Sequence, residues 1–178
     1  MAAVDPSAFR DACSRFATGV CVVTASGADG PSGMTANAVA SLSLDPPLMI
    51  VCFAHSARTL AAVEHSRRFG VHFLAHEQED VAARFASKMP EAQKFVGLTW
   101  EQRDGVPALD GCLAGLACEL RELVPGGDHL IGLGEVTSLW RGEGDPLVFY
   151  RGDYWSLTER EPAPPEVDAA LEGPGSPP

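Results

Sequence analysis

A short polar segment follows an apolar run and has the residue types that bind phosphate. The segment Ser56–Thr59 begins a stretch of helical composition directly after the apolar residues Leu48–Phe53. A helix N-terminus presents free N–H groups and the positive end of the helix dipole, which together favour an anion. The hydroxyls of Ser56 and Thr59 and the guanidinium of Arg58 would add donors. Serine is also a common helix cap, so Ser56 fits that simpler role equally well.

An uncharged segment earlier in the chain has the chemistry of a surface for a flat polar ring. Met34–Asn37 offers backbone N–H groups, a hydroxyl and an amide beside small side chains, and no charge occurs between Asp29 and Asp45. A planar, uncharged ring with polar edges can approach such a backbone closely. The alternative is a glycine-rich turn in which Thr35 and Asn37 satisfy neighbouring backbone groups.

A histidine and a group of aromatic residues are further candidates for ligand contact. His129 follows the glycine-rich turn Gly126–Asp128, where the Asp128 carboxylate could orient or charge its ring. A solvated turn histidine is the alternative. The segment Tyr150–Trp155 places aromatic residues near a glycine turn, for which packing in the core or at an interface is the simpler interpretation.

Several common catalytic motifs are missing from the sequence. Gly132–Gly134 starts a G-x-G pattern, but Thr137 takes the place of the third glycine and the segment has an antiparallel strand pattern. Neither a G-x-x-x-x-G-K-[ST] phosphate loop nor a G-x-S-x-G serine motif occurs. His72 and His76 lie four residues apart, but His72 is in a strand pattern, so we predict no metal site.

The composition limits the classes of partner. The 178-residue chain has the size of one domain, a formal net charge of −11 and a hydrophobic fraction of 46%. This charge argues against nucleic acid and against an anionic membrane as partners. No apolar run approaches the roughly 18 residues of a membrane span, and Asp5, Arg10 and Asp11 interrupt any signal-peptide core. Five cysteines without a C-x-x-C pair suit reduced thiols in a cytoplasmic protein.

Short β-type segments outnumber helical segments. The predicted strands are Val20–Ala25, the alternating residues around Leu42 and Leu44, Leu48–Phe53, Phe69–Leu74, Cys118–Val124, Leu130–Leu139 and Leu147–Tyr150. The predicted helices are one that begins at Asp5-Pro6, Arg58–Arg67 and Glu77–Lys88. Leu48–Phe53 is expected to be buried on both faces because it is apolar throughout. Short strands with hairpin-type links favour a mainly β fold, an antiparallel barrel with peripheral helices, over a doubly wound sheet.

The two ends of the chain differ in character. In the first helix, Phe9, Cys13 and Phe16 fall on one face, which predicts a packing helix that ends at Gly19. From Glu159 onward the sequence is rich in proline, glycine and acidic residues and has few apolar residues. Such a segment cannot bury enough surface to offset its ordering entropy. We therefore predict one domain over residues 1–158 and a disordered tail over residues 159–178.

Six motifs taken together resemble one protein family. They are ATGVCVVTA, GMTANAVASLSLDPPLMIVC, SART, RFASK, GGDHLIGLGEV and PLVFYRGDYW. Their order is that of the flavin reductases of two-component monooxygenases, which are FMN-binding split-barrel proteins that feed reduced flavin to a separate oxygenase. The similarity runs from about Phe9 to Leu157.

The resemblance implies a flavin site along the uncharged segment and the helix start. The residues implied to contact the flavin are Met34, Thr35, Ala36, Asn37, Ser41, Leu42, Ser43, Cys52, Phe53, Ser56, Ala57, Arg58, Thr59 and Phe85. Asp128 and His129 are implied to meet the nicotinamide nucleotide, and Tyr150 is implied to cover the ring. His129 and Tyr150 are thus the candidate catalytic residues. In this family the site lies at a dimer interface, so a homodimer is implied.

Two positions depart from the family pattern. Ala38 stands where a serine usually follows T-A-N, and His72 stands where an asparagine is common. Either change could alter flavin affinity, but neither removes a group that the chemistry needs.

On this interpretation the chain is an NAD(P)H:flavin oxidoreductase that uses FMN or FAD, takes hydride from NADH or NADPH, and supplies a separate oxygenase. One alternative is a flavin-retaining oxidase or oxygenase on the same fold. A second is a non-catalytic flavin- or heme-binding module. His129 and Tyr150 favour the reductase, because a binding module does not need a nicotinamide pocket.

Overall fold

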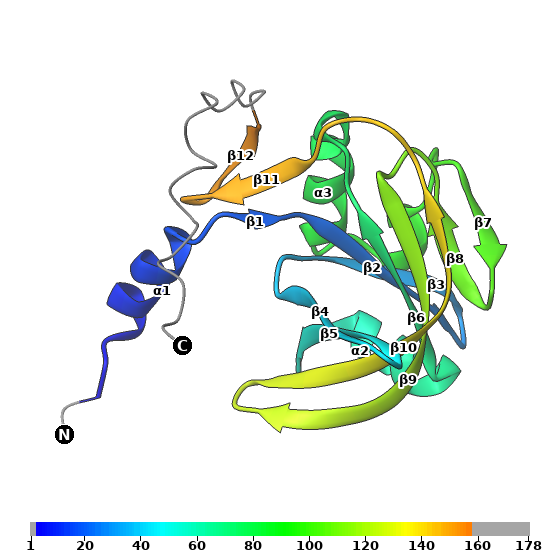
Figure 1. The fold of residues 1–178 in the computed structure, drawn as a ribbon, viewed down its shortest axis with the longest axis horizontal. Helices are drawn as coiled ribbons and strands as arrows, with labels where there is room; N and C mark the ends of the chain where they lie inside the picture. The colour runs from blue at the N-terminus through cyan, green and yellow to red at the C-terminus, as the bar shows by residue number, and fades with distance from the viewer. Residues whose placement is uncertain (1–2, 158–178) are drawn as a thin grey trace, which may run out of the picture.

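The structure is a computed structural model that describes residues 3–157, and its ribbon is a curved sheet with helices on the outside (Figure 1). The predicted tail, residues 159–178, lies outside the described residues. The helices are α1 (Pro6–Ser14), α2 (Arg58–Ser66), α3 (Glu79–Ala86) and α4 (Glu91–Lys94), with the 3-10 turn η1 (His76–Gln78). None of the helices within residues 3–157 has the length and apolar character that crossing a membrane requires.

Seven strands form the main sheet, in the order β3-β2-β6-β9-β10-β5-β4, and every neighbouring pair is antiparallel. They are β2 (Cys21–Gly27), β3 (Gly30–Ala36), β4 (Val39–Leu44), β5 (Pro47–Ala54), β6 (Arg68–Phe73), β9 (Ala114–Gly126) and β10 (His129–Arg141). The predicted mainly β, antiparallel fold is confirmed. The predicted glycine-rich turn at Gly126–Asp128 is also confirmed, because it joins the antiparallel strands β9 and β10.

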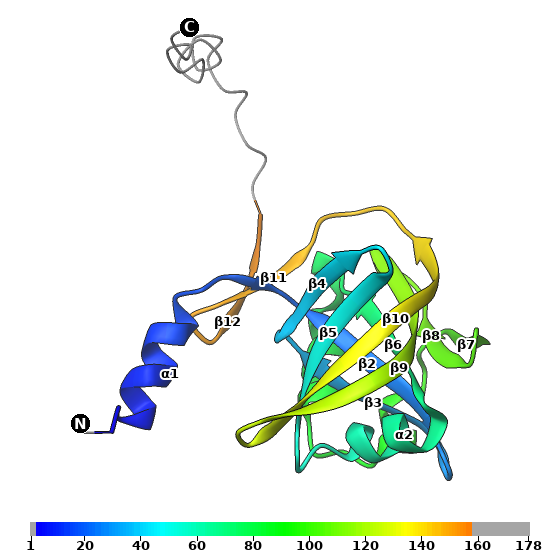
Figure 2. The same cartoon turned by 60° about the horizontal axis from the view of Figure 1, so that its bottom comes forward.

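The sheet curves around its core but stays open between its two edge strands (Figure 2). These strands, β3 and β4, follow each other in the chain and are joined through Asn37 and Ala38. Within residues 3–157 no ladder pairs β3 with β4. We call this open line the seam and define it as Thr35–Asn37 together with Ser41–Ser43.

A second unit projects from the barrel. The strands β1 (Thr18–Gly19), β11 (Leu147–Tyr150) and β12 (Asp153–Ser156) form a small sheet, while β7 (Trp100–Arg103) pairs with β8 (Val106–Leu109). The small sheet and α1 extend away from the barrel in both views (Figures 1 and 2), and we call these four elements the arm. The backbone N–H of Arg151 donates to the carbonyl of Ser14 at 2.9 Å, which joins the β11–β12 turn to α1.

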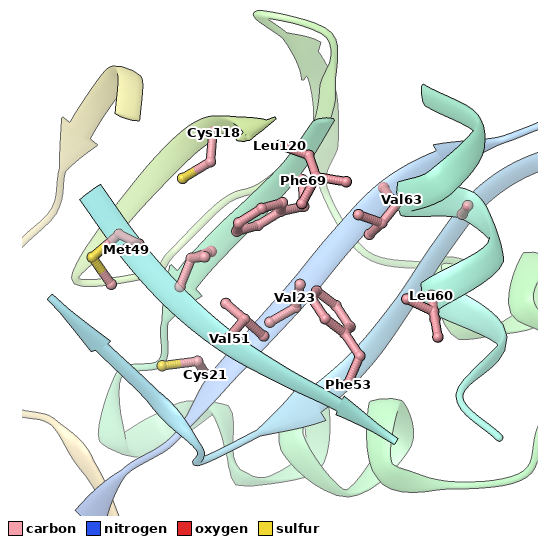
Figure 3. Packing of buried hydrophobic residues seen from close by; sticks show 13 residues of the cluster. Cys21, Val23, Met49, Val51, Phe53, Leu60, Val63, Phe69, Cys118 and Leu120 are labelled. Atoms are coloured by element: carbon pink, nitrogen blue, oxygen red, sulfur yellow. The ribbon is translucent and has the colours of Figure 1, made fainter. Parts of the chain in front are cut away.

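Two apolar clusters hold the barrel together. In the first, Phe53 and Phe69 pack edge to face with ring centroids 6.0 Å apart, and Val23 and Val51 belong to the same cluster (Figure 3). In the second, which lies under α3, the rings of Phe85 and Phe95 are perpendicular at 5.0 Å. Edge-to-face pairs stabilise a core beyond the area that they bury.

Two strand predictions need correction. β5 is not buried on both faces: Met49, Val51 and Phe53 point into the core, while Ile50 and Cys52 are half-buried on the outside. The glycine- and serine-rich segment of Met34 is not a turn but the strand β3, which pairs with β2 along its whole length. Its low strand propensity is overridden by tertiary contacts, because α2, α3 and α4 all pack on β3.

Two helix predictions are also wrong in part. α1 begins as predicted, with the Asp5 carboxylate accepting the N–H of Ala8 at 2.9 Å. It does not pack on the barrel, however, because Phe9 and Phe16 are 63% and 77% exposed. The predicted helix Glu77–Lys88 divides into η1 and α3 and ends at Ala86.

A histidine is buried in the sheet at one of the positions that depart from the family pattern. His72 of β6 is fully buried, and its Nδ1 lies 3.1 Å from the carbonyl oxygen of Val22. Because a carbonyl can only accept, Nδ1 carries the proton. Within residues 3–157 the other ring nitrogen, Nε2, has no hydrogen-bond partner. Burial lowers the pKa of His72 from 6.5 to about 4.

This histidine should make the fold sensitive to acid. The folded pKa is lowered, so the unfolded chain takes up a proton first as the pH falls below 6.5, and the stabilising effect is lost progressively towards pH 4. Between pH 7.5 and pH 5 this costs about 2 kcal/mol. We expect His72→Asn to reduce the loss of unfolding free energy over this range by about that amount. Urea unfolding of both proteins at the two pH values measures it, and equal losses would contradict the assignment.

Candidate active site

The seam provides an open row of backbone hydrogen-bonding groups without any charged side chain. An edge strand leaves N–H and C=O groups unpaired, which allows a ligand with polar edges to bind along it. Asn37 is exposed at the corner where β3 turns into β4. A hollow of about 200 Å³ reaches this corner and is lined in part by Thr35, Ala36, Phe149 and Tyr154.

A larger hollow adjoins the same corner. It has a volume of about 560 Å³, lies between α1 and the β11–β12 turn, and shares Asn37 and Phe149 with the smaller one. Arg10 and Arg151 contribute positive charge to it, and Asp11 contributes negative charge. The seam therefore has space beside it on the side that faces the arm.

β5 supports the second half of the seam. The backbone N–H of Cys52 donates to the carbonyl of Ala38 at 3.0 Å, which fixes the corner against β5. Further along, the β4–β5 register shifts between Ser41 and Ser43, so that Leu42 bulges out and is 51% exposed. A bulge re-aims side chains at a sheet edge, and here it lies in the middle of the predicted ring contacts.

α2 begins at Arg58, inside the segment Ser56–Thr59 that the sequence predicts as a helix start. Ala57, not Ser56, is the N-cap residue, so the interpretation of Ser56 as a simple cap is wrong. The Ser56 side chain is exposed beside the free N–H groups of the first turn. The Arg58 side chain is 49% exposed at the same end. These groups are suited to an anion.

Behind Arg58 lies an ion network that sequence reasoning missed. Glu91 Oε1 is 2.9 Å from Arg58 Nη2 and 3.1 Å from Lys94 Nζ. Glu91 Oε2 accepts from the Ser32 hydroxyl at 2.8 Å and from the Gly33 N–H at 2.9 Å. The Lys94 ammonium, only 4% exposed, also donates to the carbonyl of Gly33 at 3.0 Å. One carboxylate thus links α2, α4 and the backbone of β3.

The charge on Glu91 is set by two opposing effects. Burial raises the pKa of this carboxyl, but hydrogen bonds from Gly33, Ser32 and Lys94, with the Lys94 charge, outweigh burial and lower its pKa. Glu91 is therefore ionised at neutral pH, and the network is a true ion cluster.

The β9–β10 hairpin brings His129 to the same end of the barrel. His129 pairs with Ala54 at the end of β5, and the N–H of His55 donates to the carbonyl of Asp128 at 3.2 Å. His129 Nδ1 lies 2.7 Å from the Asp128 carboxylate, and this hydrogen bond and the His129 charge lower the pKa of Asp128. The imidazole is 41% exposed, next to the loop that starts α2.

Three of the residues predicted to contact the flavin have buried side chains. Phe53 and Phe85 are 0% and 1% exposed, so both rings are core residues. Phe85 supports β3 from beneath, since a Cβ on Gly33 would lie 2.5 Å from its ring. Thr59 is 1% exposed and its hydroxyl lies 3.2 Å from that of Ser32. The Thr59 hydroxyl thus belongs to the network and not to the exposed surface.

The predicted aromatic cover also differs. Tyr150 packs against Trp155 at 6.1 Å and lies under the Arg151 guanidinium. The aromatic residues beside the seam are Phe149 and Tyr154, which pack edge to face at 5.7 Å. Strand alternation could have indicated that Phe149 and Tyr150 point to opposite faces of β11, so that only one of them can lie beside the seam. Glu91 and Lys94 lie three residues apart, but no pattern in the sequence indicates their contacts with Arg58 or with Gly33, which are long-range.

This geometry fits a flavin mononucleotide or dinucleotide. The seam is neutral and open, as a flat ring with polar edges requires, and a hollow lies beside it. The α2 start supplies a cation and free N–H groups for a phosphate. A histidine lies beyond that start, on the adjoining hairpin.

Comparison with known proteins identifies the family. Residues 13–158 match the flavin reductase like domain, and the chain belongs to this family. Relatives include the reductase subunit HsaB of a flavin-dependent monooxygenase from Mycobacterium tuberculosis, 39% identical over 92% of this chain and 88% of its own. An NADH-dependent flavin reductase from Rhodococcus sp. is 41% identical over 86% of this chain and 88% of its own.

Solved structures agree with this assignment. The NADH:FAD oxidoreductase SgcE6 of Streptomyces globisporus, in complex with NAD and FAD fragments, is 34% identical. It superimposes with a TM-score of 0.78 over 93% of this chain and 99% of its own. The nitrilotriacetate monooxygenase component B homologue of Mycobacterium thermoresistibile is 37% identical, with a TM-score of 0.83 over 92% and 93% of the two chains.

Proposed function

We propose that this chain is an NAD(P)H-dependent flavin reductase that supplies reduced FMN or FAD to a separate monooxygenase component. The observation that carries the proposal is the position of the neutral seam beside a cationic helix start, with Arg58 at one end and Asn37 at the other. The relatives named as reductase subunits of flavin-dependent monooxygenases support it. So does the relative named an NADH-dependent flavin reductase.

In this proposal the protein binds and aligns two ligands. The residues that would hold the flavin are the seam residues, Met34, Cys52 and the α2 start at Ser56, Ala57 and Arg58. The bound flavin accepts hydride from the reduced nicotinamide, and this chemistry belongs to the cofactor. The backbone N–H groups of the seam would stabilise negative charge that develops on the ring. A carboxylate at the seam would oppose that charge, which explains why the segment is uncharged.

One assay separates the proposal from its alternatives. The visible spectrum of the purified protein is recorded, and NADH or NADPH consumption is then followed with and without added FMN or FAD. A reductase should consume the nicotinamide only when flavin is present, and should pass reduced flavin through a dialysis membrane to an acceptor. A retained yellow chromophore without nicotinamide consumption would instead support a flavin-binding module.

Arg58→Ala tests the phosphate site. Loss of a charge-assisted hydrogen bond to the phosphate should weaken FMN binding by about 1–3 kcal/mol. Riboflavin, which has no phosphate, should bind the variant and the parent equally. Quenching of flavin fluorescence on titration measures both affinities, and an unchanged FMN affinity would remove Arg58 from the site.

His129→Ala tests the nicotinamide contact. We propose that His129, oriented by Asp128, positions the dihydronicotinamide nucleotide but transfers no proton. The variant should therefore raise KM for the nicotinamide substrate more than it lowers kcat. Asp128→Asn, which keeps the hydrogen bond but removes the charge, is the matched control and should show a smaller rise. A collapse of kcat at unchanged KM would assign His129 a chemical role instead.

We also propose a homodimer in the cytoplasm. The arm exposes Phe9 and Phe16, which a second copy of the chain would cover. The five free cysteines suit a reducing compartment. Light scattering should give twice the monomer mass, and Phe9→Ser with Phe16→Ser should lower it towards the monomer. A monomeric parent protein, or its recovery from a membrane fraction, would contradict these assignments.

A further inference from the structure

The ion network has a graded exposure that separates its two cations. Lys94 is 4% exposed, Glu91 is 19% exposed and Arg58 is 49% exposed. Lys94 is thus the fixed, buried counter-ion of Glu91, whereas Arg58 pairs with the same oxygen from the solvent side. Ion pairs at a protein surface are worth about 0–1 kcal/mol, so the Arg58 contact can be exchanged for another anion.

The exchangeable pair borders open space. A hollow of about 540 Å³ lies between the β2–β3 turn and α2, and its lining includes Ser32, Arg58, His65 and Glu91. The guanidinium nitrogen that meets Glu91, Nη2, also donates to the carbonyl of Met89 at 2.6 Å, so this nitrogen is shared between the two acceptors. An incoming phosphate would therefore meet a guanidinium that is already shared with a carboxylate.

We propose that Glu91 is a built-in competitor of the flavin phosphate for Arg58. A bound phosphate must take the guanidinium from Glu91, and Lys94 makes this exchange possible because it still neutralises the carboxylate. The consequence is loose phosphate binding, which suits a flavin that has to leave after reduction. This inference rests on the proposed phosphate role of Arg58.

Glu91→Gln is the primary test. Glutamine keeps the size of the side chain and an oxygen for the N–H of Gly33, but it has no charge to compete for Arg58. The Kd of FMN should fall about two- to fivefold, as expected when one surface charge pair is removed. The Kd of riboflavin should stay unchanged. Fluorescence quenching titrations measure both.

A charge-balanced variant guards against misfolding, because Glu91→Gln leaves the Lys94 ammonium buried without a counter-ion. Glu91→Gln combined with Lys94→Met removes both charges and should tighten FMN binding in the same way. In the Arg58→Ala background, Glu91→Gln should give no such gain. Thermal unfolding verifies that each variant is folded before titration.

Three results would overturn the inference. Weaker FMN binding in both folded Glu91 variants would show that the carboxylate aims Arg58 and does not compete for it. Equal changes for FMN and riboflavin would show an effect on the shape of β3. A gain that persists in the Arg58→Ala background would show that Glu91 acts directly on the ligand. The Arg58→Ala variant alone tests the proposed function. If this variant loses the preference for FMN over riboflavin while the Glu91 variants have no effect, the phosphate role of Arg58 stands and only this inference is rejected.

Discussion

The barrel depends on how β3 is held at the edge of the sheet. This strand is rich in glycine and serine, which form strands poorly. It is fixed from outside by the Glu91 carboxylate and the Lys94 ammonium, which bind the N–H and the carbonyl of Gly33. From beneath, Phe85 packs where a side chain at this glycine would be. A strand of small residues can therefore keep an open, uncharged edge, because charged and aromatic groups elsewhere hold it in place.

Much of the strand pattern could be predicted from the sequence because its periodicity is local. The strand Leu147–Tyr150 has the predicted bounds, and the turn before His129 indicated the β9–β10 hairpin. Features set by distant residues could not be predicted in this way. β3 looked like a turn because its stability comes from helices that are distant in the sequence. β5 looked buried on both faces because an apolar run does not show which face is covered.

The same distinction applies to the site. The uncharged seam and the α2 start were proposed as the site from residue type alone, since ring and phosphate binding need recognisable groups. The roles of Thr59 and Phe85 could not be read from type, because both residues are turned inward by contacts with Ser32 and Phe95. The exposure of Phe9 and Phe16 has a similar cause: an amphipathic helix shows that its apolar face needs a partner, but not which chain provides it.

On the proposed function, the charge of the chain favours exchange of the ligands over tight retention. Both proposed ligands are anions, and the chain carries a formal net charge of −11, so its overall field repels them. At physiological ionic strength this field is screened beyond about 8 Å. Attraction therefore has to come from groups in contact, and the cation at the α2 start is already partly neutralised by Glu91. In this proposal, affinity comes mainly from the contact between the neutral seam and the flavin ring. The phosphate contact adds selectivity for phosphorylated flavins and slows their release only slightly.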